Sequence, residues 1–113
     1  GSLGEEFAVK HLIQSGCKIR FRNFRVSRMG EIDIIMQDGE YLCFVEVKTR
    51  AGSSFGLPYE AVTQSKQQTI RRLSSIYLQR MGTLDIPVRF DVVAVYMDRD
   101  RRTHRIEHLK NAF

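Results

Sequence analysis

The sequence lacks the features that mark several common classes of protein. Its 113 residues include only two cysteines, Cys17 and Cys43, and their spacing matches neither a metal-binding nor a redox motif. Both stand beside apolar residues, so we expect small core residues in a reducing compartment. No apolar run reaches the roughly 18 residues that a membrane-spanning helix needs, and no signal-peptide pattern is present. The sequence therefore predicts a cytoplasmic protein that does not bind membranes.

Internal repeats, low-complexity tracts and long linkers are also missing. The chain is 42% hydrophobic and 27% charged, which is enough apolar material for one core, so we expect a single domain over residues 1–113. Lysine and arginine outnumber the acids by 18 to 13, and the net charge is +5. A small basic domain suits a polyanion such as DNA or RNA. A basic net charge can also serve solubility alone, so the charge does not decide between a nucleic-acid partner and solubility.

The periodicity of apolar residues predicts an α/β protein. Helices are expected over 4–15 and 63–79, and a short strand over 18–22. Two hairpins are expected, the first from strands 31–37 and 40–50, the second from strands 89–97 and 102–108 around a charged turn. Residues 51–57 read as a flexible connection. The order α-β-β-β-α-β-β favours a mixed central sheet flanked by helices.

The first hairpin carries charges on a face that should be half-buried. Asp38-Gly39 is a two-residue turn signal, and with this loop Asp33 and Glu46 become diagonal neighbours about 7 Å apart. Alternation along the strands then defines two faces. The charged face comprises Glu31, Asp33, Phe44, Glu46 and Lys48, and the core face comprises Ile32, Ile34, Cys43, Val45 and Val47.

Three crowded carboxylates repel one another unless a cation lies among them. Hard oxygen ligands suit Mg²⁺ or Mn²⁺, and Lys48 on the same face could orient an attacking water or stabilise a phosphate that gains negative charge. The alternative is a solvated hairpin face with cross-strand ion pairs. The apolar residues that flank Glu46 favour a central strand, where exposed acids without a function are rare.

One charged residue on each expected helix points toward the same place. Glu5 lies on the apolar stripe of the first helix with Ala8 and Leu12, and Lys66 begins the stripe of the second. An acid there could instead stabilise the helix dipole, and a lysine could extend to solvent. These alternatives stay open beside a role for Glu5 at the carboxylates and for Lys66 at a bound phosphate.

A basic cluster precedes the acidic hairpin. Arg20, Arg22, Arg25 and Arg28 alternate with Phe21 and Phe24, which makes this segment the best candidate for contacting a phosphate backbone. Core aromatics between surface arginines are the alternative. The remaining candidates are weaker: His11, His104 and His108 are expected at the surface or an interface, and Arg71, Arg72 and the charged run 98–102 on solvated faces.

GEIDII (30–35) followed by FVEVKTR (44–50) resembles the core of the PD-(D/E)xK nuclease superfamily, which has the restriction-endonuclease-like fold. Within it, the chain resembles the YraN-like family of uncharacterised, endonuclease-like proteins along nearly its whole length. More distantly, it is similar to archaeal Holliday-junction resolvases. The other segments that carry the resemblance are GEEFAVKHL (4–12), Asn23 with Arg25, FGLPYEAV (55–62) with Lys66, RFDVV (89–93) and NAF (111–113).

The resemblance implies roles for residues that match the superfamily motif. Asp33 and Glu46 correspond to the metal-binding acids, with the backbone carbonyl of Val47 as a further ligand for Mg²⁺ or Mn²⁺. Lys48 corresponds to the catalytic lysine. Glu5 corresponds to the acid on the first helix that often completes the site, as a catalytic residue and a metal ligand.

Together these features predict a metal-dependent nuclease that hydrolyses phosphodiester bonds in DNA, with DNA favoured over RNA and branched or processed DNA among the candidate substrates. Glu31 and Lys66 are further site candidates. The alternative is a non-catalytic nucleic-acid-binding module of the same fold that acts in a larger complex. Relatives that cut junctions and duplexes commonly act as dimers, so a homodimer is a candidate assembly.

Overall fold

A computed structural model describes residues 2–51, 62–82, 85–98 and 104–113 of the chain. The elements, in chain order, are α1 (Leu3–Gln14), β1 (Lys18–Arg25), β2 (Glu31–Asp38), β3 (Tyr41–Ala51), α2 (Gln64–Met81), β4 (Val88–Met97) and β5 (His104–Leu109). The expected order α-β-β-β-α-β-β is confirmed, with β1 longer than expected. Most of the expected connection 51–57 and of the charged run 98–102 lies outside the described residues.

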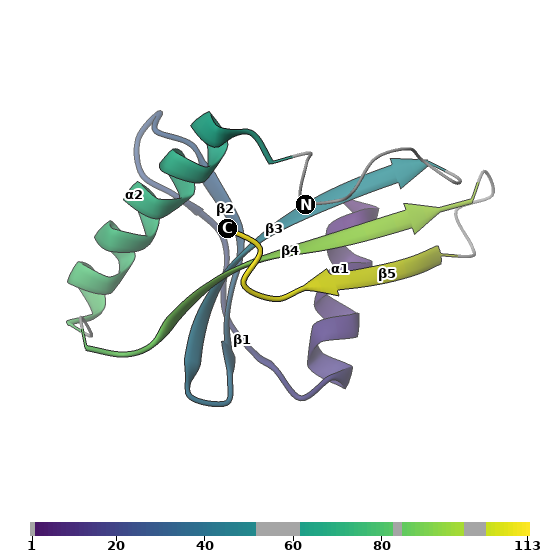
Figure 1. Cartoon of the computed structure of the whole chain (residues 1–113), viewed down its shortest axis with the longest axis horizontal. Helices are drawn as coiled ribbons and strands as arrows, with labels where there is room; N and C mark the ends of the chain where they lie inside the picture. Colours follow the sequence, from purple (N-terminus) through teal and green to yellow (C-terminus); the bar gives the residue numbers. More distant parts are fainter. Residues whose placement is uncertain (1, 52–61, 83–84, 99–103) are drawn as a thin grey trace.

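The five strands form one mixed sheet in the order β1-β2-β3-β4-β5 (Figure 1). Neighbouring strands are antiparallel except β3 and β4, which run parallel. A parallel pair needs a long crossover connection, and the segment that contains α2 provides it. This architecture is consistent with a restriction-endonuclease-like fold. Within the described residues, no helix is both long and apolar enough to cross a membrane.

Both helices begin at a side chain that caps them. The Ser2 hydroxyl accepts the Glu5 N–H at 3.2 Å before α1, and the Thr63 hydroxyl accepts the Lys66 N–H at 3.1 Å before α2. α2 ends at Gly82 in the left-handed conformation, φ 70°. These caps fix where the helices start, and thereby place Glu5 and Lys66 in their first turns.

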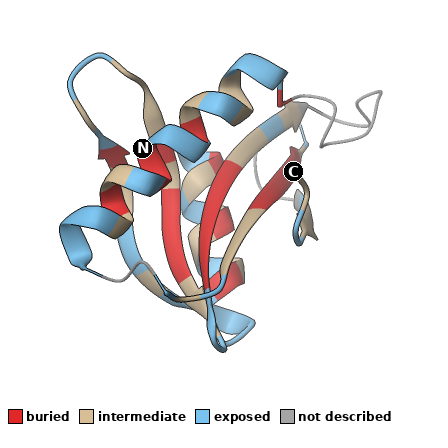
Figure 2. Ribbon diagram, turned by 60° about the vertical axis from the view of Figure 1, so that its left-hand side comes forward, coloured by how far each residue is buried: buried red, intermediate tan, exposed pale blue. Residues whose placement is uncertain are grey.

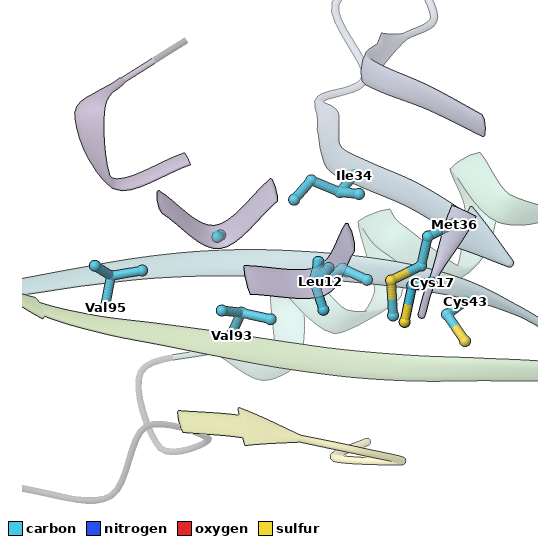
Figure 3. Packing of buried hydrophobic residues seen from close by; sticks show 9 residues of the cluster. Leu12, Cys17, Ile34, Met36, Cys43, Val93 and Val95 are labelled. Carbon is cyan, nitrogen blue, oxygen red and sulfur yellow. The ribbon is translucent and has the colours of Figure 1, made fainter. Parts of the chain in front are cut away.

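The helices pack on opposite faces of the sheet, so the central strands are buried on both sides (Figure 2). On the α1 face, Leu12 packs with Cys17, Cys43, Val93 and Val95 (Figure 3). The expectation that both cysteines are core residues is confirmed, and both are free thiols. The cluster on the α2 face consists of Phe24, Ile32, Ile35, Leu42, Phe44, Ile70, Leu73 and Tyr77.

The register of the first hairpin differs from the expected one by two residues. Asp38 pairs with Tyr41, so the loop is Gly39-Glu40 rather than Asp38-Gly39. Gly39 has φ 60° and occupies the first loop position, where a glycine adopts positive φ without strain. A shift of two preserves the faces, since side chains alternate with period two. Extending this register places Asp33 directly opposite Glu46, closer than the expected diagonal.

The alternation of β2 breaks at Asp33, which corrects the expected faces. Ile34 lies in the α1-face cluster but Ile32 lies in the α2-face cluster, although residues two apart normally share a face. The β1–β2 register puts Asn23 opposite Asp33, and Asn23 has φ 55°. Both strands therefore deviate from regular geometry at the same point, and this irregularity includes a residue of the predicted site.

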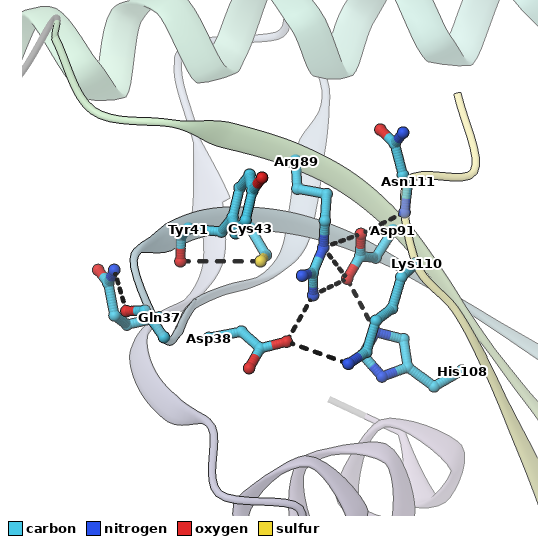
Figure 4. A network of polar contacts seen from close by, with 10 residues as sticks. Gln37, Asp38, Tyr41, Cys43, Arg89, Asp91, His108, Lys110 and Asn111 are labelled. Atoms are coloured by element: carbon cyan, nitrogen blue, oxygen red, sulfur yellow. Dashed lines mark hydrogen bonds and ion pairs between the residues drawn. The ribbon is translucent and has the colours of Figure 1, made fainter.

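A second group of charges lies on the α1 face, at the start of β4 (Figure 4). Asp91 is fully buried and accepts hydrogen bonds from Arg89, from His108 Nε2 at 2.8 Å and from the Asn111 N–H at 2.9 Å. Arg89 also donates to Asp38 at 2.7 Å. His108 was expected at the surface or an interface, and the surface position is wrong: its side chain is only 9% exposed, because it supplies a donor that the buried Asp91 needs.

Candidate active site

The carboxylate of Asp33 lies between β2 and β3. The backbone pairing of these strands ends at Ile34 and Val45, and beyond that point the Val47 N–H donates to Asp33 Oδ2 at 2.8 Å. A side chain thus takes the place of a backbone acceptor. Since the N–H and C=O of a strand residue point to the same side, the Val47 carbonyl also faces the Asp33 side of β3.

Asp33 and Glu46 form a close pair of acids. Glu46 is 4% exposed. The pKa of Asp33 is raised to about 8, because burial, the hydrogen bond with Glu46 and the negative charge of Glu46 together outweigh the lowering by the Val47 N–H. In the absence of a cation, the pair therefore retains a proton near neutral pH.

Two ammonium groups flank this pair. Lys48 Nζ and Lys66 Nζ each lie 3.8 Å from Glu46 Oε2, one from β3 and the other from the first turn of α2. Lys66 also donates to the carbonyl of Glu31 at 3.3 Å, which attaches the start of α2 to the start of β2. The two lysines thus offset part of the negative charge of the acid pair.

Gly30 allows α2 to approach β2 this closely. A Cβ at position 30 would lie 2.6 Å from Thr69 Cγ2, and Gly30 has φ 140°. Both the contact and the conformation exclude most side chains. Thr69 lies one helical turn after Lys66, so the same contact that requires glycine keeps the Lys66 ammonium near Glu46.

Beside the acids lies an open hollow of about 320 Å³, lined by Arg25, Ser27, Arg28, Gly30, Glu31 and Lys66. The charge of Glu31 in this hollow is already partly neutralised, because its carboxylate pairs with Arg25 at 3.2 Å. The hollow adjoins the carboxylate pair through Lys66. Its two arginines and one lysine against a single acid make it suitable for a phosphate group.

Glu5 of α1 contacts β1 rather than the acids themselves. Its Oε1 accepts the side-chain N–H of Asn23 at 3.0 Å, and Asn23 lies opposite Asp33 across β1 and β2. The polar contacts described for Glu5 are with Asn23 and Ser2. A direct role of Glu5 at a metal stays a prediction.

The four arginines of the basic cluster separate in space. Arg28 and Arg25 line the hollow at the acids, whereas Arg20 lines a second hollow at the far end of β1 with Lys18. Arg22 pairs with Glu6 of α1 at 2.7 Å. Each remains a predicted nucleic-acid contact, although Arg22 and Arg25 are already ion-paired within the protein.

The donor atoms fit a hard cation in part. Among the described residues, no group of three or more His, Cys, Asp or Glu side chains lies close enough together to hold a metal ion. Two carboxylates, Asp33 and Glu46, and the Val47 carbonyl remain as oxygen donors. Mg²⁺ commonly binds through one or two carboxylates and completes its shell with water and substrate phosphate, so this set suits it.

Two features of the site were not assigned from the sequence. Asn23 was noted only as part of a family motif, yet an asparagine inside a strand pattern is among the few non-glycine residues that adopt positive φ readily. The contact of Lys66 with the Glu31 carbonyl depends on how α2 packs against the sheet, and no local sequence pattern predicts that packing.

Comparison with known proteins identifies the family. The model of the uncharacterised protein family UPF0102 matches residues 4–95. A UPF0102 protein of Symbiobacterium thermophilum is 50% identical over all of this chain and 94% of its own length, and one of Acetivibrio thermocellus is 48% identical over all of this chain and 89% of its own. Another, from Pelotomaculum thermopropionicum, is 43% identical over all of this chain and 93% of its own length. The chain therefore belongs to the uncharacterised protein family UPF0102, which confirms the YraN-like resemblance seen in its sequence.

Proposed function

We propose that this protein is a Mg²⁺- or Mn²⁺-dependent nuclease that hydrolyses phosphodiester bonds in DNA. The observation that carries the proposal is the carboxylate pair of half-buried Asp33 and buried Glu46, with the ammonium groups of Lys48 and Lys66 both 3.8 Å from Glu46. Two acids forced together at a proton-retaining site are costly for folding alone. Their cost is understandable if a divalent cation replaces the proton.

Each residue then has a chemical role. Asp33, Glu46 and the Val47 carbonyl would hold the cation, which when bound would polarise a phosphoryl oxygen and lower the pKa of a water molecule. Lys48 would stabilise the negative charge that develops on the phosphate. Lys66 would contact the same phosphate from α2.

The test is cleavage of a panel of labelled linear, nicked and branched DNA and matching RNA with Mg²⁺ or Mn²⁺. Asp33→Asn should abolish cleavage, because the cation loses a charged ligand, while nucleic-acid binding is kept or strengthened, because a carboxylate that repels phosphate whenever it ionises is removed. Lys48→Ala should lower the rate by about 10²-fold, the scale of one preorganised electrostatic contact. Glu5→Gln should have a smaller effect, since its side-chain contacts are with Asn23 and Ser2. Cleavage that persists in Asp33→Asn would contradict the proposal.

One observation favours a non-catalytic alternative. Lys48 and Lys66 already neutralise Glu46 without a metal, and the described residues contain no group of three metal-binding side chains. A nucleic-acid-binding module would have the same fold and the same basic hollow. Wild-type protein that binds DNA but cleaves no member of the panel with either metal would support this alternative.

A further inference from the structure

Phe21 is an exposed aromatic side chain on an edge strand. It is 46% exposed, whereas Phe24 on the same strand is 6% exposed and belongs to the core. The Phe21 ring packs edge-on against Phe24, with centroids 5.6 Å apart, and against Tyr77 of α2 at 6.4 Å. The ring is therefore held in place on the α2 face while nearly half of its surface is open to solvent.

Cationic side chains lie on both sides of Phe21 along β1. At one end, Lys18 and Arg20 line an open hollow of about 470 Å³ together with Gly16, Gln37 and Gly39. At the other end, Arg25 and Arg28 line the hollow that adjoins Lys66 and the acids. Among the described residues, no ion pair involves Lys18, Arg20 or Arg28.

A bulge turns Phe21 to the face of the sheet that carries Lys66 and Glu46. The β1–β2 register shifts between Ile19 and Phe21, so Arg20 is the extra residue. Ile19 packs on the α1 face, and the shift turns Phe21 to the α2 face, where Lys66 and Glu46 also lie. Lys18 and Arg25 are separated by about 23 Å of extended strand. A basic strip with an aromatic ring near its middle thus leads to the carboxylate pair.

From this arrangement we infer that the β1 strip, defined as Lys18, Arg20, Phe21, Arg25 and Arg28, binds an unpaired nucleic-acid strand. Phe21 stacks on one base, and the cations contact the phosphates on either side. An exposed ring can stack only on a base that is not enclosed in a duplex, so the substrate of the site contains a single-stranded segment. This inference rests on the proposed function for its active site, but not for the binding itself.

A protective role of the charges is the main competing explanation. Lysine and arginine on an edge strand prevent pairing with other strands. That role explains the cations, but it gives no reason for a rigidly packed ring that remains exposed between them. Stacking on a base uses both features.

The test compares a blunt DNA duplex with the same duplex carrying a single-stranded tail. Binding is measured by fluorescence anisotropy in EDTA, so that no cleavage takes place. We expect the tailed duplex to bind more tightly than the blunt one. Phe21→Leu keeps apolar packing against Phe24 but removes the ring, and should weaken binding of the tailed duplex by about 5- to 150-fold with little effect on the blunt duplex. Phe21→Tyr should preserve the preference for the tail.

The controls separate stacking from general damage. Ile13→Ala removes another exposed apolar side chain, on α1, and should leave both affinities unchanged. Lys18→Glu should weaken tailed binding more than Lys10→Glu, which makes the same charge change on α1. A 2-aminopurine base in the tail should change its fluorescence with wild-type protein and not with Phe21→Leu.

Equal affinity for blunt and tailed DNA, or equal losses for both on Phe21→Leu, would overturn the inference. Such a result combined with metal-dependent cleavage of duplex DNA would leave the proposed function intact. Tail binding that depends on Phe21 without cleavage of any substrate would support the inference and contradict the nuclease.

Discussion

Lys66, in the first turn of α2, places its ammonium 3.8 Å from the buried carboxylate of Glu46 on β3. The same ammonium donates to the Glu31 carbonyl, so it contacts two of the strands that form the site. At 33% exposure its side chain is also open to a ligand from solvent. A residue with these contacts can both position the helix and meet a phosphate.

Lys66→Gln separates these two roles. Glutamine can still donate to the Glu31 carbonyl but carries no charge. We expect the cleavage rate to fall about tenfold, because the contact with the phosphate loses its charge but keeps a hydrogen-bond donor, with little change in the melting temperature. Arg72→Gln, an exposed charge on the same helix, is the matched control and should change neither. A large loss of stability with unchanged cleavage per folded molecule would mean that Lys66 acts only on the fold.

Asp33→Asn should stabilise the metal-free protein. Asparagine resembles the protonated acid, because its oxygen can accept the Val47 N–H while its amide donates to Glu46. The pKa of Asp33 is about 8 in the folded protein, above its unfolded value of about 4. The contribution of Asp33 to the free energy of unfolding of the wild type is thus fully present below about pH 4 and is lost as the pH rises toward 8.

The free energy of unfolding of Asp33→Asn, relative to that of the wild type, should therefore increase by about 1.4 kcal/mol per pH unit between about pH 4 and pH 8. Urea unfolding in EDTA from pH 5 to pH 8 measures the difference. Asp85→Asn, an exposed position before β4, should show no such gain. A constant difference between Asp33→Asn and wild type across this range would show that Asp33 is already ionised.

Asp91→Asn should destabilise the fold without directly affecting the site. Burial alone would raise the pKa of Asp91, but hydrogen bonds from His108, Arg89 and the Asn111 N–H outweigh it and hold the pKa below its usual range. This stability is present above about pH 4 and is lost as the pH falls through the lowered pKa. We expect a loss of about 3 kcal/mol at neutral pH, as for a broken buried ion pair.

Unfolding curves measured from pH 7 down to pH 2 test this expectation. Below about pH 4 the wild type should lose stability more steeply than Asp91→Asn, so the two curves converge. Parallel curves would indicate that Asp91 is not the group that titrates. The variant should cleave normally wherever it is folded, because its contacts are on the α1 face.

The fold was predictable because each element carries a local signal. The α2 helix has a threonine cap and a terminal glycine, and β2 and β3 are apolar runs around a glycine turn. Even the register error did no harm to the faces, since a shift of two residues preserves them. The alternation of β2 could not be predicted beyond Asp33, because its break depends on Asn23 in a different strand.

The site was predictable to the extent that it lies on neighbouring strands. Asp33, Glu46 and Lys48 follow from one hairpin, and the structure brings them together. The ion pair of Arg22 with Glu6 and the hydrogen bond between Glu5 and Asn23 arise from the packing of α1 on the sheet. Such contacts join residues distant in the chain, and a single sequence carries no local pattern for them.

The hydrogen bond between Asn23 and Glu5 should help to hold Asp33 in place, because Asn23 lies opposite Asp33 at the irregular point of both strands. Asn23→Asp places two carboxylates together and should lower both the melting temperature and the cleavage rate. Glu5→Gln with Asn23→Asp restores a hydrogen bond of reversed direction, so the double variant should cleave faster than Asn23→Asp alone. Asn23→Gly tolerates the φ of 55° but lacks the amide, and should lower cleavage more than it lowers stability.

A double-mutant cycle compares the initial cleavage rates and melting temperatures of four proteins. These are the wild type, Asn23→Asp, Glu5→Gln and the variant that carries both substitutions. A recovery of cleavage in the double variant would show that the bond itself, and not the charge of Glu5, supports the site. If the two substitutions act independently on the rate, Asn23 shapes β1 without positioning Asp33. Glu5 would then act on the site by itself, as the resemblance to the nuclease superfamily implies.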